Sequence, residues 1–379
     1  MIYPQNFEKK IGFDEVRHLL KEQCLSTLGK EKVDAIVFST DAEEVNEWQQ
    51  QVREFRRLET ETDGLPLNYF FDVRQAISRI RLENTHLEES ELFDLRRSLE
   101  TIGAIVTFLN KNNGDEEHEE YPYPALHRLA EDVLTFPAMI RRIDSILDKF
   151  GKIKDSASMV LAGIRHDLQQ TEGSISRTLF TILHAAQRDG LVDKDASPAL
   201  RDGRLMIPVA PAMKRKIKGI VHDESATGKT VFIEPAEVVE ANNKVRELEA
   251  AERREIIRIL TVFSDEVRPQ VPQLLGSYDF LATIDLIRAK AEWAEQTQSF
   301  EPEVVDYPHI DWIRAIHPLL WRSLKKQDKQ VVPLDIMLSQ TSNEKGAMRS
   351  GTSRGRLLII SGPNAGGNSV CLKTVGLLQ

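Results

Sequence analysis

A glycine-rich stretch near the end of the sequence has the residue types and the spacing of a phosphate-binding loop. An apolar run, Leu357 to Ile360, precedes it, and an apolar pattern typical of a helix begins at Val370. Such loops follow Gly-x-x-x-x-Gly-Lys-Ser/Thr between a strand and a helix. Their backbone N–H groups and the positive end of the helix surround a phosphate chain. The candidate phosphate-binding residues are Gly362, Pro363, Asn364, Ala365, Gly366, Gly367, Asn368, Ser369 and Val370.

Asn368 occupies the position at which this pattern has lysine, and Ser369 would supply the hydroxyl that binds Mg²⁺. Lysine places a positive charge beside the phosphates, whereas asparagine is neutral. Lys373, five residues further on, lies roughly 140° around a helix and cannot replace it. We therefore expect weakened nucleotide affinity and largely lost hydrolysis, and we assign no catalytic residue. A glycine-rich turn without any ligand is the alternative interpretation.

The composition excludes several classes of protein. The chain has 379 residues, of which 41% are hydrophobic and 29% charged, which is typical of a globular protein with two or three domains. It has no apolar run that could span a membrane, and because the polar and charged stretch from Met1 to Phe13 offers no apolar core segment we expect no signal peptide. Two cysteines are too few for a disulfide framework, which fits the cytoplasm. A net charge of −9 argues against extensive wrapping of nucleic acid but permits a local basic patch.

Residues 1–156 are predicted to form a helical core, because apolar residues recur there every three or four positions. The clearest repeats run from Phe13 to Leu20, from Val45 to Leu58 and from Leu92 to Leu109. We expect Gly29 to end the first of them. Nothing in this region indicates catalysis.

Two long helices, Ala157–Arg188 and Ala236–Val267, are predicted on either side of a β-rich segment. Each has an apolar seam that suits a coiled-coil-like partner, so we expect an antiparallel pair. Two helices of a globular bundle are the alternative. The expected seam residues are Val160, Ile164, Leu168, Ile175, Leu179, Ile182 and Ala186 in the first helix and Val238, Asn242, Val245, Leu248, Ile256, Ile259 and Phe263 in the second.

The expected domain organisation follows from these patterns. A helical core (1–156) leads into an ascending helix (157–189), a β-rich tip (190–235), a descending helix that returns to the core (236–296) and the first part of an α/β phosphate-loop domain (297–379). Because the sequence ends at Gln379, before the further strands that such a domain needs, we expect a fragment or a truncated product.

The β-rich tip is predicted to contain strands at Arg204–Val209, Lys214–His222 and Lys229–Ile233. Between positions 201 and 218 the sequence has six basic residues and one acidic residue. One interpretation is a clamp that holds a phosphate backbone irrespective of base sequence. The other is a solvated sheet edge that lysines keep soluble. The candidate nucleic-acid-binding residues are Arg201, Arg204, Lys214, Arg215, Lys216 and Lys218.

The order of these parts resembles the MutS family, and within it the endonuclease-type second bacterial branch. The likeness rests on the glycine loop with Leu372-Lys373-Thr374-Val375-Gly376 after it, on His317-Pro318-Leu319-Leu320, on the run from Ser225 to Leu248, and on Ser26-Thr27-Leu28-Gly29. The form Gly-Pro-Asn-x-Gly-Gly is specific to this family among phosphate-loop proteins.

The resemblance implies a mainly α fold. It consists of a helical core, a long antiparallel lever-helix pair that carries a small β-rich clamp, and the first part of an α/β phosphate-loop ATPase domain. It also implies ATP at Gly362–Ser369 with Mg²⁺ at Ser369, a position near the nucleotide for His317, and a homodimer in the complete protein. The family clamps DNA under the control of ATP, and this branch usually adds a C-terminal nuclease domain.

The mismatch-reading and connector domains of the main branch have no counterpart in this sequence. The resemblance therefore favours branched or recombination-intermediate DNA, in repair or recombination control. Ile316 replaces the arginine usual before His-Pro and, with Asn368, points to weak or absent ATPase activity. Phe232-Ile233-Glu234 imitates the wedge of mismatch readers, and Gly228-Lys229-Thr230 imitates a phosphate loop. We expect the first to be a buried apolar pair with a helix-entry acid and the second to lead into a strand.

Two other functions compete with this interpretation. A clamp ATPase that binds the ribosome or structured RNA in translation quality control would use the same helices and basic tip, with rRNA as its partner. A chromosome-maintenance or ABC-type ATPase is disfavoured by the order of parts. In those families the helical arm lies between the phosphate loop and the acidic strand, whereas here it precedes the loop.

Overall fold

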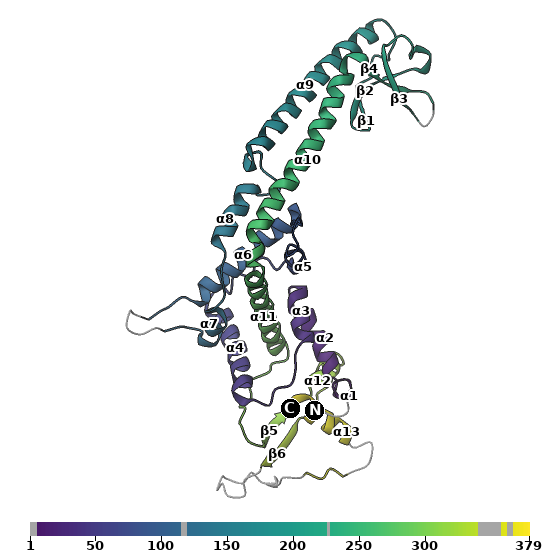
Figure 1. The fold of residues 1–379 in the computed structure, drawn as a ribbon. Coiled ribbons are helices and arrows are strands. Elements are labelled where there is room, and N and C mark those ends of the chain that lie inside the picture. The colour runs from purple at the N-terminus through teal and green to yellow at the C-terminus, as the bar shows by residue number, and fades with distance from the viewer. Residues whose placement is uncertain (1–5, 115–119, 226–227, 340–357, 362–366) are drawn as a thin grey trace. The chain divides into compact units, whose positions relative to one another are not determined.

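A computed structural model describes residues 6–114, 120–225, 228–339, 358–361 and 367–379. The fold is mainly helical with small antiparallel sheets, which confirms the predicted fold class at this level (Figure 1). The chain divides into two compact units. The first, which we call the core unit, comprises Met1–Arg74, Arg97–Pro137 and Pro272–Gln379. The second, the arm unit, comprises Gln75–Arg96 and Ala138–Val271.

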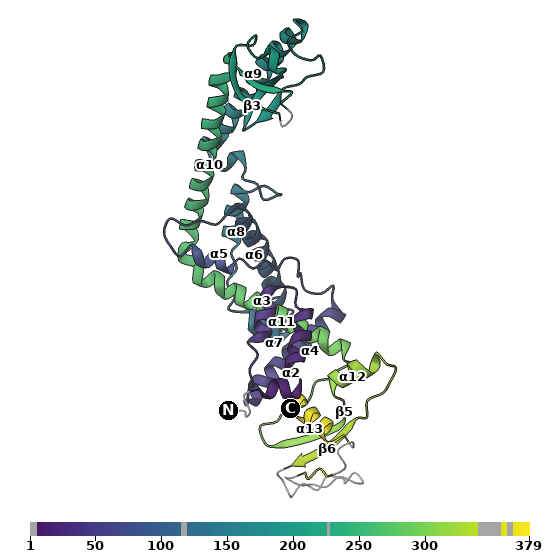
Figure 2. The same ribbon diagram turned by 90° about the vertical axis from the view of Figure 1, so that its right-hand side faces the viewer.

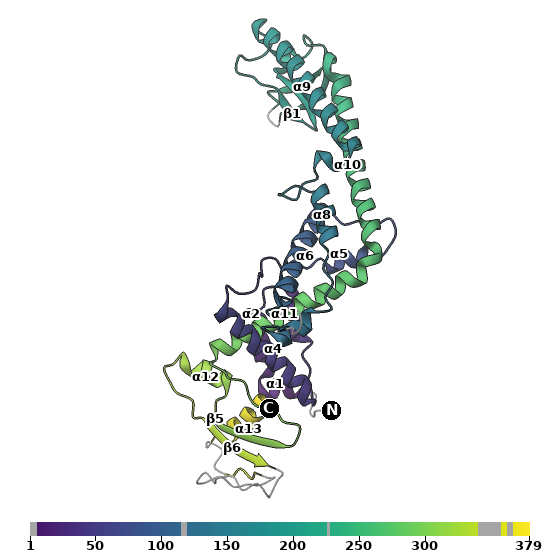
Figure 3. The ribbon, with the colours of Figure 1, turned by 90° about the vertical axis from the view of Figure 1, so that its left-hand side faces the viewer.

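The core unit is built mostly from helices. They are α1 (Phe7–Ile11), α2 (Phe13–Gln23), α3 (Thr27–Asp34), α4 (Ala42–Glu61), the second half of α6 (Glu89–Leu109), α7 (Pro124–Ala130), α11 (Val271–Gln296), α12 (Pro318–Lys325) and α13 (Asn368–Leu378). Two antiparallel strands, β5 (His309–Ala315) and β6 (Leu334–Ser339), lie at the same end of this unit as α12 and α13 (Figure 3). The last helix also contacts α1, because Gly376 lies against Ile11.

Helix α11 contributes a continuous set of buried side chains to the core unit. Leu274, Tyr278, Leu281 and Ile284 are fully buried, and Ile287 nearly so. The apolar repeat predicted from Leu92 to Leu109 is confirmed on α6. Its six residues are all buried: Leu92, Leu95, Leu99, Ile102, Val106 and Leu109.

Gly29 does not end the first predicted helix, and that expectation was wrong. Helix α2 ends at Gln23, and Gly29 lies in the first turn of α3, whose N-cap is Ser26. A Cβ atom at position 29 would lie 2.3 Å from Oδ2 of Asp285 on α11. The buried Asp285 carboxylate accepts hydrogen bonds from the N–H groups of Leu25 and Ser26, at 2.9 and 3.0 Å, and from the Ser26 hydroxyl at 2.7 Å. The glycine therefore permits a close approach between two helices.

The arm unit contains two long helices. They are α9 (Met159–Arg188) and α10 (Val239–Val267), and they accompany the shorter α5 (Arg74–Arg79), α8 (Pro137–Ile146) and the first half of α6. Both long helices are continuous, and they pack side by side in opposite directions (Figure 2). Single 3₁₀ turns stand before α9 (Asp155–Ala157), before α10 (Ala236–Val238) and after α10 (Arg268–Gln270). None of the helices within the described ranges is both long and apolar enough to cross a membrane.

The contact between α9 and α10 follows the predicted seam with small shifts. Leu168, Ile175 and Leu179 are buried as expected. On α9, however, Leu161 is fully buried whereas the neighbouring Val160 is 57% exposed, so the seam begins one residue later than predicted. Polar contacts add to the apolar ones near the start of α9: Arg165 Nε donates to Glu252 Oε1 at 2.7 Å.

A four-stranded antiparallel sheet occupies the tip of the arm unit. Its order is β1-β2-β4-β3, with β1 at Ala199–Arg201, β2 at Arg204–Val209, β3 at Gly219–Glu224 and β4 at Val231–Pro235. Strand β4 is buried along its whole length, and its Val231 and Ile233 side chains pack with those of β2, α9 and α10 in one apolar cluster. The β2 prediction is confirmed, β4 begins two residues late, and β1 was not predicted.

Candidate functional site

Four of the six predicted nucleic-acid-binding cations stand on one short loop of the tip. Lys214, Arg215, Lys216 and Lys218 are all exposed and follow a 3₁₀ turn at Pro211–Met213. The strand predicted from Lys214 begins only at Gly219, because this stretch offers a single apolar side chain to the core instead of an alternating pattern. No salt bridge within the described part of the chain engages any of the four cations.

The loop is fixed at both ends, although its charged side chains face solvent. Lys216 N–H donates to the Met213 carbonyl at 2.9 Å, and the Ile217 side chain is only 9% exposed within the tip core. Gly219 follows, where a Cβ atom would lie 2.2 Å from the backbone oxygen of Glu234 on β4. The basic side chains are therefore presented by a backbone that is anchored to the sheet.

Arg204 has a different environment from the loop cations. Its side chain is 13% exposed, and its Nη1 lies 2.5 Å from Oε1 of the fully buried Glu234. Its Nη2 donates to Asn243 Oδ1 on α10 at 2.6 Å. Because both ends of its guanidinium are engaged by the protein, we leave Arg204 out of the candidate interface.

Glu234 is the centre of a buried polar network that joins the sheet to α10. His222 Nε2 on β3 lies 2.6 Å from Glu234 Oε2, and Asn242 Nδ2 donates to Oε1 at 2.8 Å. Burial alone would raise the pKa of Glu234, but the hydrogen bonds from Asn242, Arg204 and His222 together hold it below its ordinary value. The network was not predicted, although a polar Asn242 on the apolar seam of α10 was the signal for it.

The last cation, Arg201, lies at the end of β1 and is exposed. Its guanidinium carbon is 4.5 Å from the ring centroid of Phe232. Phe232 and Ile233 are 6% and 0% exposed, which confirms the predicted buried pair in the segment that imitates a mismatch wedge. The Gly228-Lys229-Thr230 segment leads into β4, a strand, as expected.

The phosphate-loop candidates are only partly within the described residues. Gly362, Pro363, Asn364, Ala365 and Gly366 lie outside them. Gly367 is the N-cap of α13 and has a φ of 89°, a left-handed conformation that favours glycine. Asn368, Ser369 and Val370 form the first turn of that helix, and the Ser369 side chain is exposed.

The strand expected before this loop is not formed. Residues 358–361 have no regular secondary structure, and the side chains of Leu358, Ile359 and Ile360 are 50%, 80% and 36% exposed. Leu357 lies outside the described residues. A strand of this kind is stabilised by parallel neighbours on both sides. Within the described ranges, the nearby β5 and β6 pair only with each other and leave the segment without such neighbours.

His317 lies at the start of α12 and is 9% exposed. Its Nδ1 accepts the N–H of Leu320 at 3.4 Å, as an N-cap does. Burial lowers the pKa of the imidazole, and the positive charge of Lys373 on α13 acts in the same direction. The structure thus brings His317 close to the helix that follows the glycine loop. In the described part of the chain, no three His, Cys, Asp or Glu side chains converge as a metal site.

Known proteins of one kind are similar to this chain over nearly its whole length. No protein-family model matches the chain. Individual proteins named endonuclease MutS2 are similar to it. The one from a Geobacillus species is 34% identical over 368 residues, and the one from Thermomicrobium roseum is 32% identical over 379 residues. A third, from Latilactobacillus sakei, is 30% identical over 371 residues.

These alignments cover 97–98% of this chain but only 44% of each relative, so the chain spans less than half the length of the proteins it matches. The similarity extends through both units, from the helical core to the glycine loop. The chain therefore belongs to the MutS family, in the branch of the proteins named endonuclease MutS2.

Proposed function

We propose that the loop Lys214–Lys218 grips the phosphate backbone of DNA as the tip of an ATP-gated clamp. The observation that carries the proposal is the group of four exposed cations on one anchored loop, without salt bridges among the described residues. Cations that are already paired gain little from a phosphate, whereas these four are available to release counterions from DNA. We propose branched or recombination-intermediate DNA as the substrate, in repair or recombination control.

The two long helices suit the role of levers. They are continuous, they pack against each other over an apolar seam, and the tip core is continuous with that seam. A rigid pair of this kind transmits a displacement of its base to its tip, because packed side chains are not freely deformable. We propose that nucleotide binding supplies that displacement in the complete protein, which acts as a homodimer.

The residues of the glycine loop fit ATP and Mg²⁺ in part. Gly367 has a left-handed conformation before α13, the N-terminus of that helix would attract a phosphate, and the exposed Ser369 hydroxyl is a suitable Mg²⁺ ligand. Bound Mg²⁺ neutralises charge on the phosphates. Asn368 adds no charge of its own, so we propose gating by weak nucleotide binding with little hydrolysis. The endonuclease activity in the relatives' name is proposed only for the complete protein.

The proposal is tested by the salt dependence of DNA binding. The test variant carries Lys214→Gln, Arg215→Gln, Lys216→Gln and Lys218→Gln. The slope of log K against log salt is negative, and its magnitude should decrease by about 3 to 4 in this variant, since each phosphate contact contributes about 0.9. A variant with the same change of charge in the core unit (Lys9→Gln, Lys10→Gln, Lys30→Gln and Lys111→Gln) is the control and should keep the slope. These four lysines are also exposed.

Fluorescence anisotropy with a four-way DNA junction, a linear duplex and a structured RNA measures both the slope and the preference. We expect the junction to bind most tightly. An unchanged salt slope in the tip variant would refute the clamp assignment. Tighter binding of RNA than of DNA would mean that the loop grips RNA instead.

A further inference from the structure

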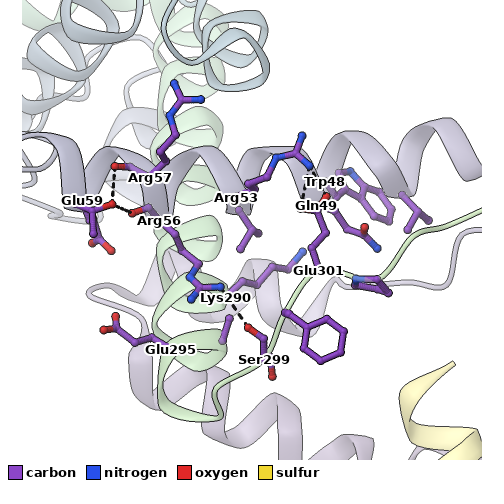
Figure 4. Close-up of a pocket in the computed structure, with 16 residues that line it drawn as sticks. Trp48, Gln49, Arg53, Arg56, Arg57, Glu59, Lys290, Glu295, Ser299 and Glu301 are labelled. Carbon is purple, nitrogen blue, oxygen red and sulfur yellow. Dashed lines mark hydrogen bonds and ion pairs between the residues drawn. The ribbon is translucent and has the colours of Figure 1, made fainter. Parts of the chain in front are cut away.

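The core unit contains a cavity of about 710 Å³ that the proposed clamp does not use. Helices α4 and α11 and the segment after α11 line it (Figure 4). Val45, Trp48 and Val52, which belong to the apolar pattern predicted for α4, face this cavity and are only half-buried. The volume suits a small organic molecule, and apolar walls with a few polar groups are typical of ligand sites.

Lys290 reaches from α11 into the cavity, toward α4 (Figure 4). Its Nζ lies 5.8 Å from the centroid of the Trp48 ring. No salt bridge within the described part of the chain joins it to a carboxylate, and burial lowers the pKa of its ammonium group. A desolvated cation without a counter-charge is unfavourable unless a ligand supplies one.

The other cations of the cavity already have partners. Arg53 Nη1 lies 2.8 Å from Glu301 Oε1, and Arg56 Nη1 donates to the Ser299 carbonyl at 3.3 Å (Figure 4). Arg57 pairs with Glu61 at 3.0 Å. Among the described lining residues, Lys290 is therefore the cation that an anionic ligand would meet without displacing a hydrogen bond or a salt bridge.

Gln49 provides a second polar group on the α4 side. Its Oε1 atom is buried, and it has no hydrogen-bond partner in the described part of the chain. Buried acceptors are nearly always satisfied, so one that is left over beside a cavity calls for a donor from outside the chain. A ligand with an O–H or N–H group would provide it.

We propose that this cavity binds a small planar organic anion. Its carboxylate or other acidic group contacts Lys290, its ring packs against Trp48, and an O–H or N–H group donates to Gln49 Oε1. The charge-assisted contact supplies the counter-charge that Lys290 lacks, and tryptophan offers a flat apolar surface to a ring. The site is independent of the DNA clamp.

The probe for this site is 6-hydroxy-2-naphthoate, which carries a carboxylate and a distant hydroxyl on a planar ring. Isothermal titration calorimetry should detect its binding to the unmodified chain and an affinity lower by about tenfold or more in Lys290→Met. The neutral 6-hydroxy-2-naphthamide should bind more weakly than the naphthoate and equally to both proteins. Gln49→Leu should weaken both compounds.

A matched control is Lys325→Met, because Lys325 Nζ also stands over a tryptophan, 4.3 Å from the Trp321 centroid, but is exposed. It should leave naphthoate binding unchanged. Lys290→Met should keep or raise the melting temperature, since it removes an unpaired desolvated charge. Equal binding of naphthoate and naphthamide, no binding of the naphthoate, or an equal loss in Lys325→Met would overturn the proposal.

Discussion

Arg204 on β2 and Glu234 on β4 form an ion pair between two strands of the tip, with 2.5 Å between Nη1 and Oε1, in which Glu234 is fully buried. Arg204 therefore links strand β2 to strand β4 and, through its hydrogen bond to Asn243, to helix α10. The loop cations, which are close to it in sequence, face solvent instead. The pair separates two roles within one basic segment: one arginine fixes the tip, and four cations are left for a ligand.

Replacement of Arg204 tests this separation of roles. Arg204→Ala leaves the Glu234 carboxylate buried with fewer donors, which should destabilise the tip by about 3 kcal/mol. Hydrogen exchange of the amides in β2 and β4 measures this change as a lower opening free energy. The control Arg201→Ala removes an exposed cation–π contact and should cost less than about 1 kcal/mol. If hydrogen exchange were unchanged in Arg204→Ala and the salt dependence of DNA binding were weaker, Arg204 would instead be a DNA contact.

The hydrogen bonds that join the start of α9 to Glu255 on α10 should stabilise the fold in a pH-dependent way. The Ser158 hydroxyl donates to Glu255 Oε1 at 2.5 Å, and Arg258 Nη2 donates to it at 2.7 Å. Hydrogen bonds from Arg258 first and Ser158 second lower the pKa of Glu255 from 4.5 to about 2. Because the pKa is lower in the folded state, this contribution to stability is complete above pH 4.5 and is lost as the pH falls toward 2.

Thermal melting at several pH values between 7 and 2.5 measures this contribution. Glu255→Gln should lower the melting temperature at pH 7 and flatten the loss of stability below pH 4.5. Glu247→Gln, at an exposed position of the same helix, is the control and should follow the unmodified chain. If the Glu255→Gln profile were parallel to that of the unmodified chain throughout, the hydrogen bonds to Glu255 would not stabilise the folded state.

Gly29 should be intolerant of any side chain. A methyl group there would meet Asp285 Oδ2 at 2.3 Å, and the carboxylate cannot move without losing hydrogen bonds to the N-terminus of α3. We expect Gly29→Ala to destabilise the core unit by about 1–3 kcal/mol. The control is Gly276→Ala on α11, where a Cβ atom meets nothing within 4 Å. It should be neutral or stabilising by up to about 1 kcal/mol. Urea unfolding of both variants, followed by circular dichroism, decides between them, and equal stabilities would contradict the close approach.

The long helices could be predicted from sequence because their own periodicity determines them. The predicted limits of α9 and α10 agree with the structure to within three residues at each end. Leu168, Ile175 and Leu179 recur at spacings that only a helix places on one face. The exact seam could not be predicted in the same way, since Val160 and Leu161 are adjacent apolar residues and only the partner helix selects Leu161.

The features that sequence patterns missed depend on contacts between distant segments. The role of Gly29 depends on Asp285, which lies more than 250 positions away and leaves no local signal. The burial of Arg204 depends on Glu234 and Asn243, so its charge alone suggested a solvent-facing residue. The segment after Leu357 failed as a predicted strand for a related reason, because a strand also requires neighbours.

Asn368 is the residue that departs from the phosphate-loop pattern. Asn368 begins α13, directly after the left-handed Gly367. In Asn368→Lys, a point charge should reach the β and γ phosphates, and we expect the affinity for Mg²⁺-ATP to rise by about tenfold or more. Fluorescence titration with a labelled ATP analogue measures the gain. Asn368→Gln keeps a neutral amide at similar length and should give none, which separates charge from reach. Tight ATP binding by the unmodified chain, weakened in Asn368→Ala, would instead mean that the amide serves the nucleotide as well as a lysine does.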